Sequence, residues 1–382
     1  MIAIENANIV LEQGILTGGT LLTENGRISA VGRACDVPVP QHAERIDAGG
    51  LLVGPGFVDI HVHGGNGSFF YEDPIRTAAY FLSHGETTVL ATLYYDLTKQ
   101  GFLESIDRIK DAMRSEGAGR AIGGMYMEGP YMNPKYGASP EKNKWRGEIC
   151  PEQYEDVVER AGTLARVWAI APERAGLEPF LEKVTAVNPD AVISVGHSEA
   201  TPAQILALRH YGITLQTHCM NATGRPACCA GTRSCGPDEA CLMDDDMYAE
   251  LICDSQGIHV PPDLLSLVLK VKGVDRVILI SDSYVSTEPS PKELSHITDL
   301  QFDAGGNLCG SKLTLDVACR NMMKHTGCSV HDVFLMASAN PARAVGLYGE
   351  VGSIAEGKRA NLVMLNESFS VKHVMLDGTL VR

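Results

Sequence analysis

The middle of the chain, from about residue 54 to 345, alternates short apolar runs with segments of helical periodicity. Eight runs have the length and composition of buried strands, at residues 57–63, 86–93, 121–128, 165–171, 191–197, 213–218, 248–254 and 276–282. Helical patterns lie between most of them, as at residues 201–212 and 261–273, where a proline suits the first turn. Eight such units predict an α/β protein with a closed parallel (β/α)8 barrel.

A doubly wound open sheet shows the same alternation, because periodicity does not reveal whether a sheet closes. Open sheets of that kind commonly carry a G-x-G-x-x-G phosphate loop after the first strand, and the glycines after residue 63 do not form this pattern. We therefore predict the barrel and keep the open sheet as the alternative.

Both ends of the chain consist of short apolar runs separated by turn residues. An Asn-Gly step at residues 25–26 and an Asp-Gly step at residues 377–378 are strong hairpin signals. The two ends thus predict one small discontinuous β-sandwich domain. Its parts, residues 1–53 and 346–382, flank a barrel domain of residues 54–345.

The composition narrows the class of protein. With 382 residues and 45% hydrophobic content the chain can bury a large core, and no run approaches the roughly 18 apolar residues of a membrane span. The start lacks the pattern of a secretory signal, and eleven cysteines without a C-x-x-C pair favour a reducing, cytoplasmic compartment. A net charge of −15 argues against nucleic acid or membrane as a partner, but a few local donors can still hold a phosphorylated small molecule.

Polar residues stand at the carboxyl ends of five predicted strands. They are His61 and His63, Glu128, His197, His218 and Asp282. In a parallel barrel these ends meet at one face, and side chains two residues apart in a strand point to the same side. Imidazoles and carboxylates together suit divalent zinc, iron or manganese. Taken singly, each residue could be a hydrogen-bonded structural group or a helix cap, so their joint placement is what predicts the metal site.

These residue types predict hydrolysis of an amide. A divalent ion lowers the pKa of bound water toward ~7 and polarises a carbonyl. Asp282 is the candidate proton carrier, which takes a proton from the attacking water and passes it to the departing amine. The cysteines have no strand-end placement beside a base, so no Cys-His nucleophile competes.

The chain also resembles a known family over almost its whole length. The segments, in order, are PGFVDIHVHG, MEGPYMNPKYGA, VGHSEAT, THCMNATG, GIHV, LISDS, LCGSKLTLDVACRNM, ASANPARAVGL and GSIAEGKRANLVML. They are similar to those of the N-acetylglucosamine-6-phosphate deacetylases of the amidohydrolase superfamily. The resemblance implies a metal-dependent barrel enzyme that removes the acetyl group from an amino-sugar phosphate, foremost N-acetylglucosamine 6-phosphate.

The resemblance also implies residue roles. The implied principal metal ligands are Glu128, His197 and His218, and Asp282 is the implied proton shuttle. His61 and His63 match a pair that only some members keep, and with it a second ion becomes possible, bridged by Glu128. The implied sugar-phosphate contacts are Asn221, Ala222, His259, Leu308, Cys309 and Gly310. Members are typically homodimers in which an arginine reaches across to the phosphate.

Three segments depart from the family pattern. The stretch after THCMNATG is altered, and within it Arg225 or Arg233 is expected to supply the guanidinium for a phosphate. Ser139 stands where many members have a histidine near the acetyl carbonyl, and residues 255–256 read Ser-Gln instead of the common Asp-Gly. All three changes concern substrate contacts, so the substrate stays more open than the reaction type.

The altered stretch contains Cys228, Cys229, Cys235 and Cys241. Structural zinc sites use cysteines two to four residues apart in paired knuckles, and this spacing differs from that pattern. We expect a loop of reduced cysteines rather than a second metal site.

Other functions stay open at this point. One is an amidohydrolase for a different N-acyl substrate: N-acetylgalactosamine 6-phosphate, an unphosphorylated N-acetyl sugar or an N-acyl amino acid. Relatives that act on cyclic amides carry a carboxylated lysine after strand four, which WAIAPE lacks, and an adenosine-type deaminase needs a glutamate closer to His197 than Glu199. A sugar-phosphate sensor without turnover is opposed by the presence of Asp282.

Overall fold

A parallel sheet of eight strands forms the centre of the protein in the computed structural model, which describes residues 1–138 and 140–382. The strands follow one another around the sheet in chain order. They are β6 (Phe57–Val62), β9 (Glu86–Tyr94), β10 (Ile122–Glu128), β11 (Ala165–Ile170), β12 (Val192–Val195), β13 (Ile213–Gln216), β14 (Tyr248–Ile252) and β15 (Val277–Ile280). Each of the eight predicted strands is present.

The first and last strands of this sheet lie side by side at their carboxyl ends. The amide N–H of Asp282 donates to the carbonyl oxygen of His61 at 3.0 Å, and that of His63 donates to the carbonyl of Ser283 at 3.0 Å. These bonds bring β15 against β6, so the sheet is a nearly closed barrel. The predicted barrel is confirmed and the open sheet is excluded.

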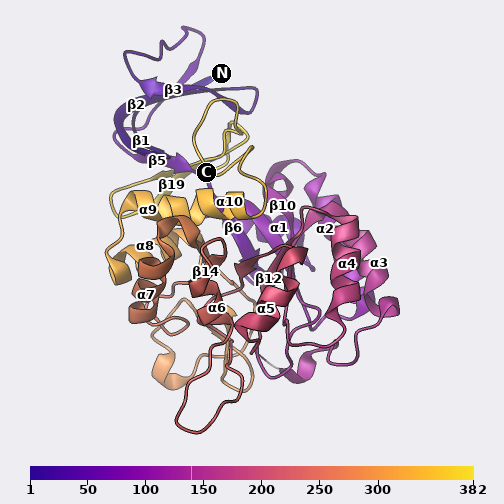
Figure 1. Ribbon diagram of the computed structural model, residues 1–382. Coiled ribbons are helices and arrows are strands. Elements are labelled where there is room, and N and C mark those ends of the chain that lie inside the picture. The colour runs from indigo at the N-terminus through magenta and orange to yellow at the C-terminus, as the bar shows by residue number, and fades with distance from the viewer. Residues whose placement is uncertain (139) are drawn as a thin grey trace.

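Helices surround the barrel and cover its outer face (Figure 1). They are α1 (Pro74–Ser83), α2 (Lys99–Met113), α3 (Pro151–Ala161), α4 (Leu177–Val187), α5 (Pro202–Leu208), α6 (Pro237–Met243), α7 (Pro262–Lys272) and α8 (Leu315–Thr326). Their apolar faces bury large side chains such as Phe81, Phe102 and Phe180 against the strands. Side-chain caps start several of them, as at Thr201, which forms a capping box with Gln204.

The two chain ends form one further sheet. Its strands are β1 (Ile2–Leu11), β2 (Gly14–Glu24), β3 (Arg27–Arg33), β4 (Glu44–Asp47), β5 (Leu52–Pro55), β18 (Leu362–Leu365), β19 (Val371–Leu376) and β20 (Thr379–Leu380). Both predicted hairpins are present, with positive φ at Asn25 and Gly26 and again at Asp377 and Gly378, as type I′ turns require. In Figure 1 this sheet lies beyond α9 (Val330–Phe334) and α10 (Asn340–Ala344), and both termini lie beside it.

Two small hairpins lie outside both sheets. One pairs β7 (Gly64–Gly65) with β8 (Ser68–Phe69), directly after the first barrel strand. The other pairs β16 (Leu300–Phe302) with β17 (Leu308–Ser311), and it has its own apolar cluster around Ile297.

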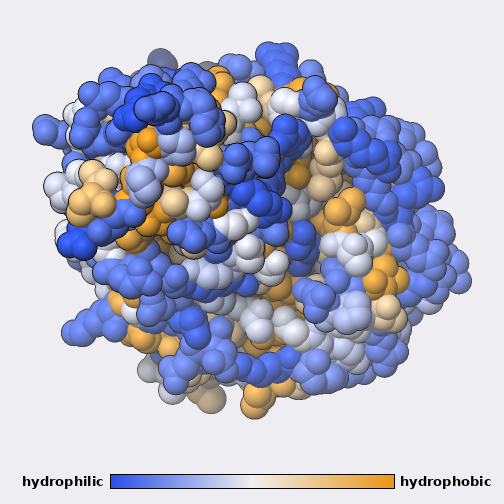
Figure 2. All heavy atoms as spheres, turned by 90° about the horizontal axis from the view of Figure 1, so that it is seen from above, coloured by the Kyte–Doolittle hydropathy of each residue, from blue (hydrophilic) through white to orange (hydrophobic). Residues whose placement is uncertain are grey.

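Seen from the side of the terminal sheet, the surface is mostly hydrophilic, with apolar residues in small groups between polar ones (Figure 2). Among the described residues, no helix combines the length and the apolar character that crossing a membrane requires.

Candidate active site

The barrel brings the six predicted polar residues together at the carboxyl ends of its strands. All six are buried: His61, His63, Glu128, His197, His218 and Asp282. His61 belongs to β6 and Glu128 ends β10, whereas the others follow their strands within two residues. Because parallel strands converge at this end, residues more than 200 positions apart share one site.

Three of these residues have backbone angles that side chains other than glycine rarely adopt. The φ angle is 45° at His197, 28° at His218 and 45° at Asp282. Such conformations cost free energy and persist where the surrounding structure holds them, often at functional sites. The turns after β12, β13 and β15 thus use strained backbone to aim these side chains at one another.

Glu128 lies at the centre of the cluster. Its Oε1 atom is 2.7 Å from His197 Nε2 and 3.1 Å from His218 Nε2, and its Oε2 atom is 3.1 Å from His63 Nε2. Two groups of possible ligands therefore share this carboxylate, one with His197 and His218 and one with His61 and His63. These are the ligand groups found within the described part of the chain.

The hydrogen bonds of His218 indicate that its Nε2 atom is available to bind a cation. Its Nδ1 atom is 3.0 Å from the carbonyl oxygen of Asn221, which can only accept, so a neutral ring carries its proton there. Nε2 then presents a lone pair, 3.1 Å from Glu128 Oε1 and 3.1 Å from His197 Nε2. Electron-pair donors that converge in this way are stabilised by a cation.

His61 repeats this arrangement on the other side of Glu128. Its Nδ1 atom is 3.1 Å from Glu250 Oε2, so in the neutral ring the proton lies on Nδ1 and the lone pair on Nε2. Nε2 is buried without a hydrogen-bond partner within the described residues, and it lies 3.7 Å from Glu128 Oε1 and 3.7 Å from Asp282 Oδ1. The donor set fits a divalent metal such as zinc, because imidazole and carboxylate are among its usual ligands.

The electrostatics of the cluster agree with a cation site. Burial alone lowers the pKa of His61, but the charge and hydrogen bond of Glu128 outweigh it and raise the pKa well above its usual value. Burial alone raises the pKa of Glu128, and the charges of His61 and His197 lower it well below the usual value. The surroundings thus keep Glu128 ionised and draw positive charge into the cluster.

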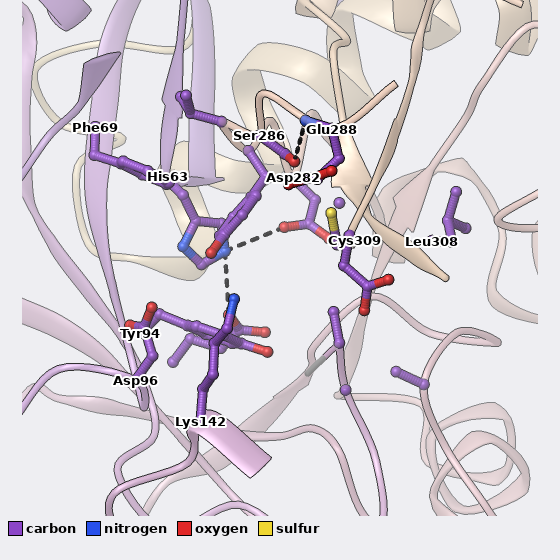
Figure 3. A pocket seen from close by; sticks show the side chains of 18 of the residues that line it. His63, Phe69, Tyr94, Asp96, Lys142, Asp282, Ser286, Glu288, Leu308 and Cys309 are labelled. Carbon is purple, nitrogen blue, oxygen red and sulfur yellow. Dashed lines mark hydrogen bonds and ion pairs between the residues drawn. The ribbon is translucent and has the colours of Figure 1, made fainter. Parts of the chain in front are cut away.

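Asp282 lies between the cluster and the open cavity. Its Oδ1 atom is 3.3 Å from His63 Nε2, the contact drawn as a dashed line in Figure 3. Burial raises the pKa of Asp282, but the hydrogen bond from His63 and the charge of His61 lower it below its usual value. The carboxylate is therefore ionised and able to accept a proton.

Glu250 is a site residue that the sequence analysis missed. It lies in β14 and is fully buried, and its Oε2 atom also accepts from the backbone N–H of His218 at 3.2 Å. One carboxylate therefore orients ligand residues from two strands. A charged residue inside the apolar run YAELICD was the available signal, because an unpaired carboxylate is seldom buried.

A cavity of about 680 Å³ opens above Asp282 and the histidines. It has the size usual for small-molecule sites. The predicted sugar-phosphate contacts all line it: Asn221, Ala222, His259, Leu308, Cys309 and Gly310. Figure 3 shows Leu308 and Cys309 on one side of this cavity and Tyr94 and Asp96 on another, with His63 and Asp282 between them.

The predicted phosphate-binding arginines do not line this cavity. Arg225 contacts Glu239 Oε1 through Nε at 3.0 Å and through a terminal nitrogen at 2.6 Å, and Arg233 contacts the same oxygen at 3.3 Å. Glu239, at the start of α6, thus holds both guanidinium groups outside the cavity of their own chain. Ser139 lies outside the described residues.

The cysteines of the altered stretch are free. Cys228, Cys229 and Cys235 are exposed, whereas Cys241 is buried in the barrel core. None of them belongs to a possible metal-ligand group within the described residues.

A parallel barrel with imidazole and carboxylate ligands at the carboxyl ends of its strands defines a metal-dependent hydrolase. Comparison with known proteins identifies the family. Residues 52–381 match the amidohydrolase family, and the chain belongs to it.

Within this family, the similar proteins are deacetylases of amino-sugar phosphates. The chain is 30% identical to an N-acetylgalactosamine-6-phosphate deacetylase of Escherichia coli O157:H7, over 97% of each chain. It is 28% identical to an N-acetylglucosamine-6-phosphate deacetylase of Vibrio furnissii, over 94% of this chain and 89% of the relative. The resemblance predicted from the sequence is confirmed.

Solved structures agree with this grouping. N-acetylglucosamine-6-phosphate deacetylase from Pasteurella multocida superposes with a TM-score of 0.86 at 25% identity, over 99% of both chains. A mutant of the Mycobacterium smegmatis enzyme, in complex with N-acetyl-D-glucosamine-6-phosphate, gives 0.82 at 28% identity, over 100% of this chain and 99% of that one.

Proposed function

We propose that this protein is a metal-dependent deacetylase of N-acetylated amino-sugar phosphates, foremost N-acetylglucosamine 6-phosphate. The observation that carries this proposal is the convergence of Glu128 with four histidines at the floor of a cavity in an amidohydrolase barrel. Water adds to the amide carbon, the carbon–nitrogen bond breaks, and the products are acetate and the free amino sugar phosphate.

The residues of the cluster have separate tasks in this proposal. His61, His63, Glu128, His197 and His218 hold one or two divalent ions, zinc foremost, with iron and manganese as alternatives. When bound, the metal supplies acidified water and polarisation of the acetyl carbonyl.

Asp282 carries the proton. Its ionised carboxylate accepts a proton from the attacking water at an Oδ atom and donates it to the departing amine nitrogen. Asp282 borders the cavity, so one carboxylate can reach both positions. His63 Nε2, the atom proposed to hold a metal, lies 3.3 Å from Asp282 Oδ1, so Asp282 borders the metal position.

A second candidate substrate is N-acetylgalactosamine 6-phosphate. The relative named for this activity is 30% identical to the chain. An unphosphorylated N-acetyl sugar is the third candidate, because Arg225 and Arg233 are held at Glu239 instead of lining the cavity. The three candidate substrates present the same N-acetyl group to the metal cluster at the floor of the cavity. They differ in the part of the sugar that faces the cavity mouth.

We also propose a homodimer in a reducing, cytoplasmic compartment. The arginines that lie outside their own cavity fit an arrangement in which one of them reaches the partner's phosphate. Eleven free cysteines support the reducing compartment.

The proposal is tested by acetate release. Purified, metal-loaded protein is incubated with the glucosamine and galactosamine forms of the N-acetyl sugars, each with and without a 6-phosphate. We expect acetate from at least one phosphorylated sugar, at rates well above those with an N-acetyl amino acid. Release from the amino acid alone would contradict the proposal.

A further inference from the structure

The charged side chains around the cavity are mostly acidic. Beyond the metal cluster, the carboxylates that line it are Glu72, Asp96, Glu288 and Asp303. Lys142 is the only lysine or arginine among the described residues of the lining. A doubly charged substrate group would be repelled over most of this wall and attracted at Lys142.

Lys142 reaches into the cavity from the segment after β10. It ends a short 3-10 helix, Pro140–Lys142, and its side chain is exposed at the cavity mouth. Figure 3 shows its amine pointing inward below His63, with Asp96 on one side and Cys309 on the other. Its charge lowers the pKa of both Asp96 and Cys309, although burial raises both pKa values overall, so the ammonium lies near both walls.

The geometry of an amino-sugar phosphate fits this position. The acetamido group on carbon 2 and the phosphate on carbon 6 lie on opposite sides of the sugar ring. If the amide carbon lies at the floor beside Asp282, the phosphate faces the mouth. Cys309, near Lys142, belongs to the stretch that the family resemblance assigns to sugar-phosphate contacts.

We propose that Lys142 binds the substrate phosphate and is the residue of this chain that favours phosphorylated over unphosphorylated N-acetyl sugars. This inference rests on the proposed function and goes beyond it, because neither Arg225 nor Arg233 lines the cavity of its own chain. An ammonium group is a compact point charge with three donors, which suits a phosphate that approaches from an acidic wall.

The test compares kcat/KM for acetate release from the phosphorylated and unphosphorylated forms of one N-acetyl sugar, with zinc-loaded protein. Lys142→Gln removes the charge and Lys142→Arg keeps it. Lys144→Gln is the matched control, because Lys144 is exposed two residues further on and does not line the cavity. Loss of one charge-assisted contact predicts a roughly 10- to 100-fold lower kcat/KM for the phosphorylated sugar in Lys142→Gln.

The pattern across substrates decides the outcome. We expect Lys142→Gln to leave kcat/KM for the unphosphorylated sugar within about twofold, Lys142→Arg to keep most of the preference, and the control to match the wild type. An equal loss on both sugars, or an unchanged preference in Lys142→Gln, would overturn the role of Lys142 while leaving deacetylation intact. Absence of acetate from every sugar with the wild type would instead overturn the proposed function.

Discussion

The Nε2 atoms of His197 and His218 lie 3.1 Å apart, and both face Oε1 of Glu128. The ring of His218 points its lone pair into this space because its Nδ1 donates to the carbonyl of Asn221. Two imidazoles and a carboxylate at these distances supply three of the four ligands of a tetrahedral metal site.

His197→Ala removes one of these donors. We expect bound metal per chain to fall and metal affinity to drop strongly, since the remaining donors no longer surround the ion. His42→Ala removes an exposed histidine between β3 and β4 of the terminal sheet and is the control. Elemental analysis after dialysis checks the expectation, and unchanged metal content in His197→Ala would refute this ligand assignment.

Asp282→Asn removes the proton acceptor and keeps the size of the side chain. We expect kcat to fall by roughly 10²- to 10⁴-fold while bound metal and folding are retained. Asp245→Asn, in an exposed loop, serves as the control. Steady-state kinetics beside metal analysis separate the two effects. A variant with wild-type kcat would show that the proton is carried elsewhere.

Glu250→Gln tests the carboxylate that orients His61 and His218. Its charge strengthens the donor character of His61 through the 3.1 Å bond to Nδ1, and an amide lacks that charge. We expect metal affinity to weaken by roughly 10- to 100-fold, which competition with a chelator measures. Equal affinity in both proteins would mean that Glu250 has only a packing role.

Asp377→Asn tests a group of ion pairs at the boundary of the terminal sheet and the barrel, in which Arg120 is the partner from the barrel. Asp377 accepts from Arg359 at 2.5 and 2.8 Å and also contacts Arg120, beside β10. Burial raises the pKa of Asp377, but the bonds and charges of the two arginines lower it below its usual value. We expect the substitution to lower the free energy of unfolding at pH 7 by about 1–3 kcal/mol.

The ion pairs of Asp377 also predict that stability depends on pH. Because the folded pKa is depressed, this stabilisation is present above the unfolded value of about 3.9 and is lost as the pH falls through the folded value. The difference between wild type and Asp377→Asn should therefore shrink in acid, as urea unfolding at several pH values would show. Asp36→Asn, which breaks an exposed pair with Arg33, should change stability less than Asp377→Asn does, because solvent screens the exposed charges. A difference that is constant with pH would contradict the ion-pair account.

The barrel and the floor of the site were predictable from the sequence for one reason. A buried strand ends where its apolar run ends, so the polar residues that follow, such as His197 after AVISVG, are located by local pattern alone. Parallel closure then places these ends together. The hairpins were equally local, because Asn-Gly and Asp-Gly steps favour positive φ.

The residues that line the mouth of the cavity were less predictable, because contacts between residues far apart in the sequence determine which side chains lie there. Arg225 and Arg233 follow the strand-six histidine closely, yet Glu239 pairs with both and holds them away from the cavity. Lys142 lines the cavity because of the path of an irregular segment, which hydrophobic periodicity does not describe. The role of Glu250 was not predicted because its partners, His61 and His218, come from other strand segments.

The central claim is that a metal held by this cluster is required for deacetylation. The most direct test strips the protein with a chelator and titrates zinc back while bound metal and acetate release from N-acetylglucosamine 6-phosphate are followed together. We predict no turnover without metal and a rise in activity that saturates at one or two ions per chain. Full activity in the stripped protein, or none in the fully loaded protein, would contradict the account.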